Sequence, residues 1–395
     1  MKNKNDMLAR LYLIQEALQK TNVHSWLFYN VFHRDSIADD ILFVPKNNMN
    51  TRPWFFIVPN IGPPLKIVHS IEISSLQHLP AQQQVYSSRK ELLSILTNCL
   101  AKTPSVAINY SSTIPALSLV DYGLVTLLHG LQQKIISAAS LIQLVIGILN
   151  NDGIASHEYS SQILHMIVKE TWSWVKSILH NNKPLYEGEI RDRILSKIKD
   201  ANLVSEESPI VAVGLNSSDP HYQPAGKGSL IEQEQVLQFD LWGKKNNEDA
   251  IFADISWVAY TGIKPPGKVL DVFHAVKSAR EGTINFIREN LKNTMNITGS
   301  QVDTHTRKIF SEINLLKFVK HRTGHAIDTR LHGIGVNLDS QEFPDDRLLL
   351  NGSCFSVEPG LYTNQFGIRS EINAYIYQNQ LKVSGSERQE TMLTL

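Results

Sequence analysis

Five side chains able to bind a metal ion stand in the second half of this 395-residue chain, in the order Asp, Asp, His, Glu, Glu. They are Asp240, Asp254, His325, Glu358 and Glu371, and each lies in a short segment typical of a strand or strand end. Four gathered carboxylates would repel one another severely without compensating positive charge. Oxygen ligands with one imidazole suit two divalent ions better than a structural zinc site, which favours thiolates. The fold must therefore bring distant strands together around a pair of metal ions.

Length and composition bound the class of protein. A chain of 395 residues is too long for one ordinary core and should form two domains or one large one. Its 38 basic and 38 acidic residues give a net charge of zero, which argues against nucleic acid or an anionic membrane as the main partner. Only two cysteines occur, and the N-terminal segment lacks the apolar core of a signal peptide. We expect a cytoplasmic protein with no membrane partner.

Short apolar strands alternate with helical patterns over residues 1–152, which predicts a small α/β domain. Strands are expected at residues 26–29, 41–44, 54–58, 65–69 and 106–110. Helices are expected to begin near Asn5, Ser88 and Asp121, and Ser88 forms a capping-box pattern with Glu91. The domain has no concentrated set of catalytic residue types, so we interpret it as a scaffold or dimerisation domain.

A turn cluster at residues 150–153 predicts the boundary with a second domain, residues 153–395. Apolar residues at helical spacing predict a helix that ends near residues 181–184. Further helices are expected at 186–199, 269–292 and 300–313, with strands around Asp240 and Asp254 and from the last helix to the C-terminus. Helices and antiparallel strands segregated in this way predict an α+β domain.

The two aspartates lie on either side of a polar, turn-rich stretch, residues 243–249. A hairpin there would bring both carboxylates to one face of a sheet. Apolar neighbours would anchor the two strands: Leu241, Trp242, Phe252 and Ile255. Taken alone, each aspartate could instead end a strand or cap a turn, because isolated aspartates are common.

The two glutamates have distinctive neighbours. Pro359 and Gly360 follow Glu358 and would end its strand directly after the carboxylate. Arg369 precedes Glu371 by two residues, so on a strand both side chains point to the same face. The arginine could orient a metal-binding carboxylate or bind an anionic end of a substrate. The pair could also be a surface ion pair, which contributes little.

Histidines gather in the segment HRTGHAIDTRLHGIG, where His325 and His332 lie seven residues apart. The glycines of this segment indicate backbone that turns or approaches another group closely. A lone histidine is more often a packed or surface residue than a ligand, and the nearby His321 shows that the stretch is rich in histidine anyway. His221, in the segment DPHYQP, is a third candidate.

Taken together, the ordered set resembles a known family, the pita-bread metallopeptidases. The resemblance rests on the order Asp…Asp…His…Glu…Glu and on the segments HRTGH, FSVEPGLY and GIRSE, and it is strongest to the Xaa-Pro aminopeptidase and prolidase (creatinase-like) branch. It covers about residues 155–395. The segment YNVFHRDSIADDIL resembles the creatinase-type N-terminal domain less specifically. The resemblance implies a C-terminal pita-bread domain with a smaller N-terminal α/β domain.

The resemblance also implies a role for each metal-competent residue. Asp240 would hold one divalent ion, and Asp254 and Glu371 would bridge both ions. His325 and Glu358 would complete the shell of the second ion. Manganese is the expected metal, although cobalt, iron and zinc accept the same ligands.

Four residues would act on the substrate by the same resemblance. His221 and His332 match histidines that hydrogen-bond the substrate and the reaction intermediate, and Arg369 matches an arginine that organises the site. Glu358 would pass a proton to the leaving amine. The implied reaction is hydrolysis of short peptides with proline at the second position, by a homodimer whose N-terminal domain limits access to short peptides.

Two departures and two alternatives qualify the expected function. Asp240 and Asp254 are 14 residues apart, so the hairpin has an enlarged turn, and Ser256-Trp257 stands where many relatives have Thr and Arg. A metal-dependent lyase could use the same site. A catalytically silent binding module is the lesser alternative, because members of that kind usually lack several ligands and all five are present here.

Overall fold

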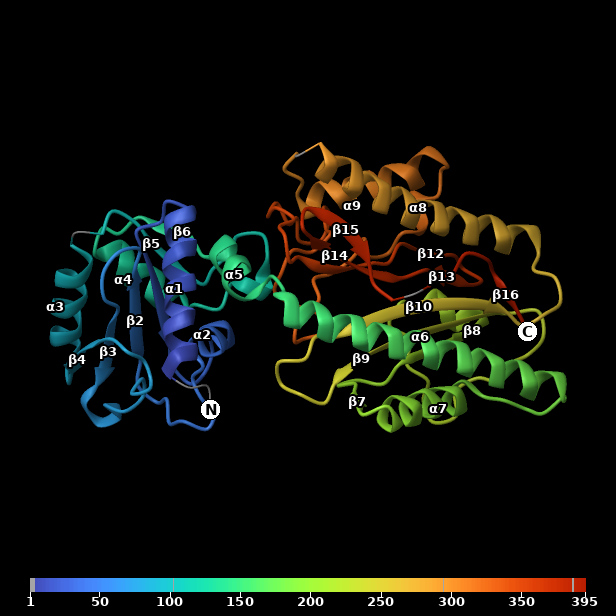
Figure 1. Cartoon of the computed structure of the whole chain (residues 1–395), viewed down its shortest axis with the longest axis horizontal. Coiled ribbons are helices and arrows are strands. Elements are labelled where there is room, and N and C mark those ends of the chain that lie inside the picture. The colour runs from blue at the N-terminus through green and yellow to red at the C-terminus, as the bar shows by residue number, and fades with distance from the viewer. Residues whose placement is uncertain (1–3, 102, 294, 386) are drawn as a thin grey trace. The chain divides into compact units, whose positions relative to one another are not determined.

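The chain divides into two compact units, residues 1–146 and residues 147–395, whose elements are labelled in Figure 1. The computed structural model describes residues 4–395 except for residues 102, 294 and 386. Each unit combines helices and strands. The division predicted after Asp152 falls within the first turn of helix α6 (Asn151–His180).

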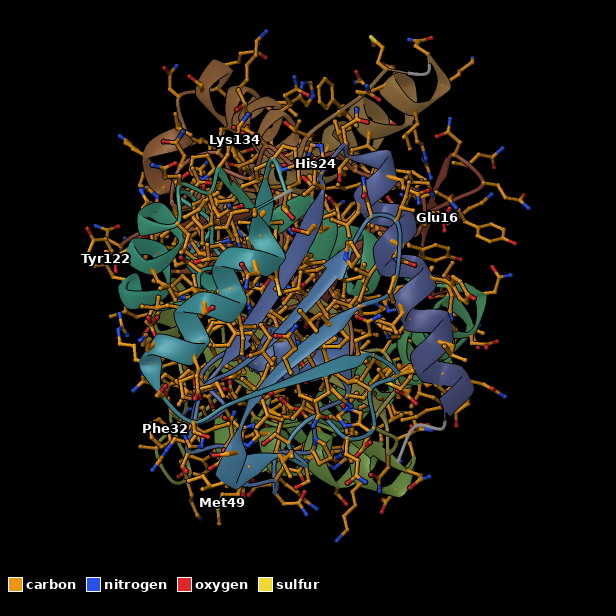
Figure 2. All side chains as sticks on the ribbon, turned by 90° about the vertical axis from the view of Figure 1, so that its left-hand side faces the viewer. Glu16, His24, Phe32, Met49, Tyr122 and Lys134 are labelled. Carbon is orange, nitrogen blue, oxygen red and sulfur yellow. The ribbon has the colours of Figure 1, made fainter. Side chains whose placement is uncertain are left out.

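The first unit is built on a six-stranded mixed sheet with the order β4-β3-β2-β1-β5-β6. Its strands are β1 (Ser25–Asn30), β2 (Trp54–Pro59), β3 (Leu65–His69), β4 (Gln82–Tyr86), β5 (Val106–Ile108) and β6 (Ile135–Ser137). Its helices are α1 (Lys4–Lys20), α2 (Ser36–Leu42), α3 (Arg89–Leu100), α4 (Tyr122–Gly130) and α5 (Ala139–Ile146). Figure 2 shows the sheet between α1, which carries Glu16, and α3. Alternate residues of the strands pack on α3 and α4, for example Leu27 and Phe55, which share a buried cluster with Leu96 of α3.

The strand predicted at residues 41–44 is wrong, because Ile41 and Leu42 end helix α2. The Asp35 side chain caps this helix by accepting a hydrogen bond from the backbone N–H of Ala38. Phe43, with φ of 51°, ends it in the left-handed region. A run of four apolar residues cannot by itself distinguish a strand from a buried helical turn. By contrast, the capping box predicted at Ser88 is present at the start of α3.

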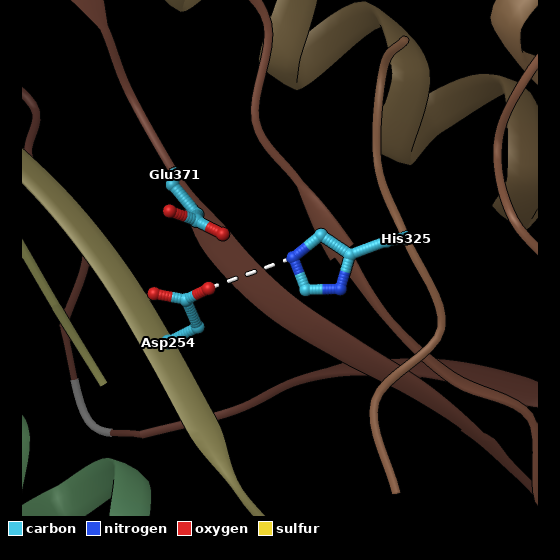
Figure 3. A group of neighbouring side chains, drawn as sticks. All are labelled: Asp254, His325 and Glu371. Carbon is cyan, nitrogen blue, oxygen red and sulfur yellow. Dashed lines mark ion pairs between the residues drawn. The ribbon is translucent and has the colours of Figure 1, made fainter. Parts of the chain in front are cut away.

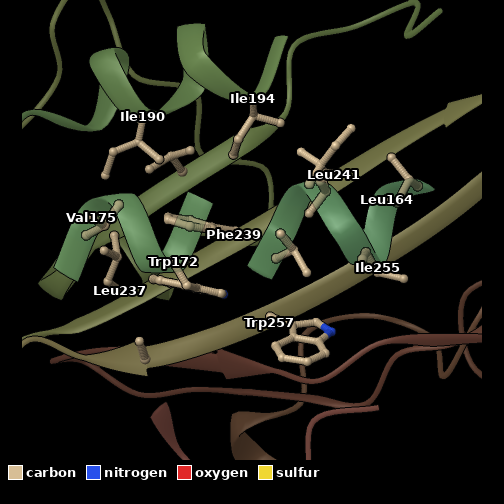
Figure 4. Close-up of a cluster of buried hydrophobic side chains, with 14 of the residues drawn as sticks. Leu164, Trp172, Val175, Ile190, Ile194, Leu237, Phe239, Leu241, Ile255 and Trp257 are labelled. Atoms are coloured by element: carbon tan, nitrogen blue, oxygen red, sulfur yellow. The ribbon is translucent and has the colours of Figure 1, made fainter. Parts of the chain in front are cut away.

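The second unit is organised around a long antiparallel hairpin of β9 (Val236–Lys245) and β10 (Ala253–Tyr260). β7 (Leu203–Val204) and β8 (Ile210–Val213) pair with β9, and β16 (Leu393–Thr394) pairs with β10. One face of this sheet packs on α6 and α7 (Glu187–Asp200). Figure 4 shows α6 residues such as Trp172 and Val175 against Phe239 and Leu237 of β9. The other face bears the two aspartates.

Two further helices and two smaller sheets complete the second unit. The helices are α8 (Gly267–Lys292) and α9 (Gly299–Glu312). One sheet contains β11 (Cys354–Val357), β14 (Ile372–Tyr377) and β15 (Gln380–Val383), and the other pairs β12 (Gly360–Tyr362) with β13 (Gly367–Arg369). The predicted α+β class is confirmed. No helix in the described ranges is both long and apolar enough to cross a membrane.

The prediction of continuous strands after the last helix is wrong for residues 320–352. This stretch forms only isolated bridges, such as Gly324 with Leu338 and Ala326 with Phe355. Asp303 of α9 is fully buried, and its carboxylate accepts hydrogen bonds from the backbone N–H groups of Thr323 (2.9 Å) and Ser340 (2.8 Å). The Asp303 carboxylate therefore accepts hydrogen bonds from backbone N–H groups that would pair with a neighbouring strand in a regular sheet. The irregular segment that carries His325 is held by these bonds.

Candidate metal centre

The register of the hairpin places Asp240 and Asp254 on one face. Asp240 lies opposite Ser256, and Asp254 lies opposite Trp242. Because side chains alternate between faces with a period of two, these four residues share the face that points away from α6. Asp240 and Asp254 are buried, with exposed fractions of 6% and 4%. The sequence predicted this hairpin, and the structure contains it.

Backbone hydrogen bonds bring the remaining three residues to that face. Glu371 lies between β13 and β14, and its backbone N–H donates to the carbonyl oxygen of Ser256 at 3.2 Å. Glu358 directly follows β11. The backbone N–H of His325 donates to Ser356 Oγ at 2.9 Å, and the N–H of Ser356 donates to the His325 carbonyl at 2.9 Å. Backbone hydrogen bonds therefore tie His325 to β11 and Glu371 to β10, and the end of β11 positions Glu358.

Asp254, His325 and Glu371 form the centre of the cluster, with ligand atoms that all lie within 4.8 Å of one another. Figure 3 shows the two carboxylates converging with the imidazole. His325 Nε2 lies 3.5 Å from Asp254 Oδ2 and 3.6 Å from Glu358 Oε1. Asp240, the fifth predicted ligand, is joined to Glu371 through the hydroxyl group of Ser256. The structure therefore brings all five predicted residues together.

The carboxylates of the cluster repel one another. Burial, and then the charges of Asp240 and Glu358, raise the pKa of Asp254 well above its usual value. The pKa of Glu371 is raised in the same way, by burial and by Asp254 first among its neighbours. Burial lowers the pKa of the His325 imidazole, so this ring is neutral and able to act as a ligand at neutral pH. The cluster is short of positive charge.

Two carboxylate oxygens of the cluster have no hydrogen-bond partner among the described residues. They are Asp254 Oδ1 and Glu371 Oε1, and both are buried. An unpaired buried acceptor costs about 1–3 kcal/mol, and more when it is charged. Divalent cations would satisfy these oxygens and offset the repulsion, and oxygen ligands with one imidazole are chemically suited to such ions. The residues present fit a metal centre.

Arg369 holds one side of the cluster. It is 3% exposed, and its guanidinium donates through Nη2 to Asp240 Oδ2 and through Nε to Ser256 Oγ at 2.9 Å. Burial alone would lower the pKa of Arg369, but the charge of Asp240 raises it well above its usual value. Arg369 therefore remains a cation and fixes the Asp240 carboxylate. One arginine offsets only part of the charge of four acids.

The two histidines predicted to contact substrate are placed differently. The His332 ring lies 4.4 Å from the His325 ring, and burial lowers the pKa of His332 to about 4. His221 lies in an exposed loop, where its backbone N–H donates a hydrogen bond to Asp219 Oδ1. The loop reaches the cluster through Pro220, whose carbonyl accepts a bond from Arg369. His332 therefore lies beside the proposed ligand His325. His221 is only a chain neighbour of Pro220, whose carbonyl contacts Arg369.

Sequence reasoning missed three polar residues of the site. Ser256 Oγ lies 2.7 Å from Asp240 Oδ1 and 3.0 Å from Glu371 Oε2, so it links two ligands. His321 Nε2 lies 2.7 Å from the hydroxyl of Tyr362. The signal for Ser256 was its position two residues after Asp254, on the same strand face. His321 and Tyr362 lie within the motifs HRTGH and VEPGLY, but nothing in those motifs indicated that they contact each other.

Comparison with known proteins places the chain in a family. The metallopeptidase family M24 matches residues 155–378, more than half of the chain. The chain belongs to metallopeptidase family M24. The resemblance to the pita-bread metallopeptidases is therefore confirmed.

Curated relatives carry two kinds of name. A putative Xaa-Pro aminopeptidase of Mycoplasma genitalium is 29% identical over 181 residues, which cover 44% of this chain and 46% of the relative. An Xaa-Pro dipeptidase of Lactobacillus delbrueckii subsp. lactis is 26% identical over 181 residues, which cover 44% of each chain. The chain therefore spans less than half the length of the curated relatives it matches.

Solved structures share the fold over the whole chain. Dipeptidase PepE from Mycobacterium ulcerans superposes with a TM-score of 0.71 at 18% identity, covering 100% of this chain and 99% of that one. An X-prolyl aminopeptidase from Caenorhabditis elegans, described as a cytosolic enzyme with a di-nuclear active site, gives a TM-score of 0.67 at 18% identity, covering 97% and 62%. At these identities the likeness shows the fold alone. The pita-bread fold is confirmed.

Proposed function

We propose that this chain is a metal-dependent hydrolase of short peptides with proline at the second position, an Xaa-Pro aminopeptidase or dipeptidase. The observation that carries the proposal is the buried cluster of four carboxylates and one imidazole, with unpaired oxygens on Asp254 and Glu371. Membership of family M24 and the names of the relatives support the peptide substrate.

Two divalent ions would be held by the five clustered residues. Asp240 would hold one ion, Asp254 and Glu371 would be shared by both, and His325 and Glu358 would hold the other. When bound, such a pair lowers the pKa of a shared water and polarises a carbonyl group. Oxygen ligands favour manganese, while cobalt, iron and zinc accept the same set. The C. elegans structure, described as di-nuclear, supports the count of two.

The chain's own groups supply proton transfer and positioning. Burial would raise the pKa of Glu358, but the positive charges of Arg369 and Arg322 help to hold it below its usual value. Glu358 is therefore a carboxylate that can accept a proton and pass it to the leaving amine. His332 is neutral at pH 7, so its ring N–H can donate to the substrate oxygen where negative charge develops. His221 would hold the substrate from the exposed loop, and Arg369 keeps Asp240 in place.

Assembly and location complete the proposal. The first unit carries no candidate metal site among its described residues, and creatinase-type N-terminal domains commonly mediate dimer contacts. We therefore propose a homodimer in which this unit limits access to short peptides, in the cytoplasm. A lyase would use the same ligands without a leaving amine. A catalytically silent module is disfavoured because all five ligand side chains are present and gathered.

A substrate screen after metal exchange tests the proposed function. The protein is stripped with a chelator, reloaded with Mn²⁺ or Co²⁺, and assayed on Ala-Pro, Ala-Pro-Gly and Ala-Ala. Reloading should restore hydrolysis of at least one proline peptide in preference to Ala-Ala. Preferential cleavage of Ala-Ala, or no hydrolysis of any of the three by protein that holds two ions, would refute the proposed function.

A further inference from the structure

Trp242 lies at the metal centre itself. It is directly opposite Asp254 in the hairpin, on the face that carries Asp240 and Ser256. Its exposed fraction is 5%, between the 4% of Asp254 and the 6% of Asp240. Cβ atoms of directly opposed residues are about 4.5–5.5 Å apart. Trp242 and Asp254 are therefore cross-strand neighbours on one face of the hairpin, and both side chains are buried.

The indole nitrogen of Trp242 lacks a partner. Nε1 is buried and makes no hydrogen bond among the described residues. The same is true of Trp172, but that ring stacks on Phe239 at 3.6 Å and 7° on the opposite face of the sheet, which packs on α6. An unpaired indole alone therefore indicates nothing about ligands. What distinguishes Trp242 is that it lies on the sheet face that bears Asp240 and Asp254.

A buried apolar cluster surrounds Trp242. We call it the Trp242 cluster. Its buried members include Ile210, Ala212, Phe252, Ile327, Cys354 and Tyr375. Tyr222 and Leu331 are only partly buried and pack against it. Tyr222 directly follows His221 and Leu331 directly precedes His332, so two of the five partly buried residues that pack against the cluster are chain neighbours of these histidines.

We propose that Trp242 is a specificity-determining residue that contacts the substrate. Its ring packs against the pyrrolidine ring of the substrate's proline, and its Nε1–H donates to a carbonyl oxygen of the peptide. Proline rings pack readily on aromatic faces because they are rigid and apolar. A ligand that leaves the buried Nε1–H without an acceptor also binds less tightly, so the site discriminates against it. This inference rests on the proposed function and identifies Trp242 as the residue that recognises the proline of the substrate.

Three variants of the metal-loaded protein separate the two contacts. Trp242→Phe keeps a ring but removes the donor, and should lower kcat/KM about 10-fold for Ala-Pro and Ala-Ala alike. Trp242→Leu removes the ring, and should lower the preference for Ala-Pro over Ala-Ala by about 10-fold or more. Both should keep two ions per chain. Trp172→Phe is the matched control, because it removes an equally buried, unpaired indole N–H from the other face, and should leave kcat/KM and the preference unchanged.

A second measurement covers a variant that folds poorly. Binding of proline, the product, should quench tryptophan fluorescence in the wild type and in Trp172→Phe but not in Trp242→Phe. An unchanged substrate preference in Trp242→Leu, or quenching that persists in Trp242→Phe, would overturn the inference. Loss of metal in both Trp242 variants would also overturn it, because the indole would then support Asp254 and not the substrate. A metal-loaded wild type that cleaves neither peptide would instead refute the proposed function, and the inference with it.

Discussion

Each unit of the molecule buries a group of acids, and the two groups differ in how their oxygens are used. In the first unit, Asp35 accepts hydrogen bonds from the backbone N–H of Ala38 at 2.8 Å and from Asn109 Nδ2 at 2.7 Å. Asp39 accepts from Asn30 Nδ2 at 2.9 Å and lies 2.8 Å from His33 Nδ1. In the second unit, Asp254 and Glu371 each keep one oxygen without a partner among the described residues.

This difference separates a structural group from a metal centre. Burial raises the pKa of Asp35 to about 7 although it is fully hydrogen-bonded, so a raised pKa does not by itself indicate an ion. The first group satisfies its oxygens with donors of its own unit and needs no cation. In the second group, Asp254 Oδ1 and Glu371 Oε1 lack such donors among the described residues, and the acids lie close together. Unpaired oxygens, and not burial or a raised pKa, point to a metal.

The largest effect is expected from removing a proposed bridge. Asp254→Ala should lose both ions and lower peptide hydrolysis by more than the 10–100-fold typical of residues that only orient a ligand. Elemental analysis and a peptide assay measure the two losses. A variant that retains two ions would show that Asp254 is not a ligand.

His332→Ala should separate catalysis from metal binding within the same unit. The His332 ring adjoins His325 but is assigned no ion, so the variant should keep its metals and lose about 10²–10⁴-fold in kcat. Steady-state kinetics with metal analysis on the same sample tests this. Equal metal loss in the His332 and Asp254 variants would make the assignment of His332 wrong.

In the metal-free protein, replacing an acid by alanine should change the free energy of unfolding differently in the two groups. Asp39→Ala leaves the donors of Asn30 and His33 unpaired, so it should lower the free energy of unfolding by about 1–3 kcal/mol. Asp254→Ala removes a mutually repelling acid and should leave stability unchanged or raise it. Denaturant unfolding of both variants without metal makes the comparison. A large loss of stability in metal-free Asp254→Ala would contradict it.

The smallest expected effect is a pH dependence that metal abolishes. In the metal-free fold, the raised pKa values of Asp254 and Glu371 mean that the folded state binds protons more tightly than the unfolded chain. Their contribution to stability is therefore present at low pH and is lost as pH rises from about 4 through the folded-state values. Mn²⁺ should remove this part of the slope, and leave the part due to Asp35. Identical pH slopes of the melting temperature with and without Mn²⁺ would contradict the account.

The sequence predicted the elements that depend on local patterns. A polar, turn-rich stretch between two strand-like segments predicted the hairpin of Asp240 and Asp254, and a capping-box pattern at Ser88 predicted the start of a helix there. It failed at residues 41–44, where a short apolar run fits a strand or a helix equally well. It failed again at residues 320–352, because the backbone there is held by the distant Asp303, whose bonds leave no periodic pattern.

The site was predictable in its ligands but not in their surroundings. The ligands follow from the residue types and from the resemblance to a family. The hydroxyl of Ser256 and the indole of Trp242 acquire their positions only from the register of β9 with β10, which places them opposite Asp240 and Asp254. Trp242 was interpreted from sequence as an anchor of the strand. Pairing across strands is a tertiary property, so the sequence alone did not assign these neighbours.

The most direct test of the central claim is a count of bound ions in matched variants. Metal-free wild type, Asp254→Ala and Asp39→Ala are titrated with Mn²⁺ by calorimetry, and the bound metal is then measured by elemental analysis. The account predicts two ions per chain in the wild type and in folded Asp39→Ala, and none retained in Asp254→Ala. An active wild type that holds no metal and resists chelation, or a variant Asp254→Ala that binds two ions, would contradict it.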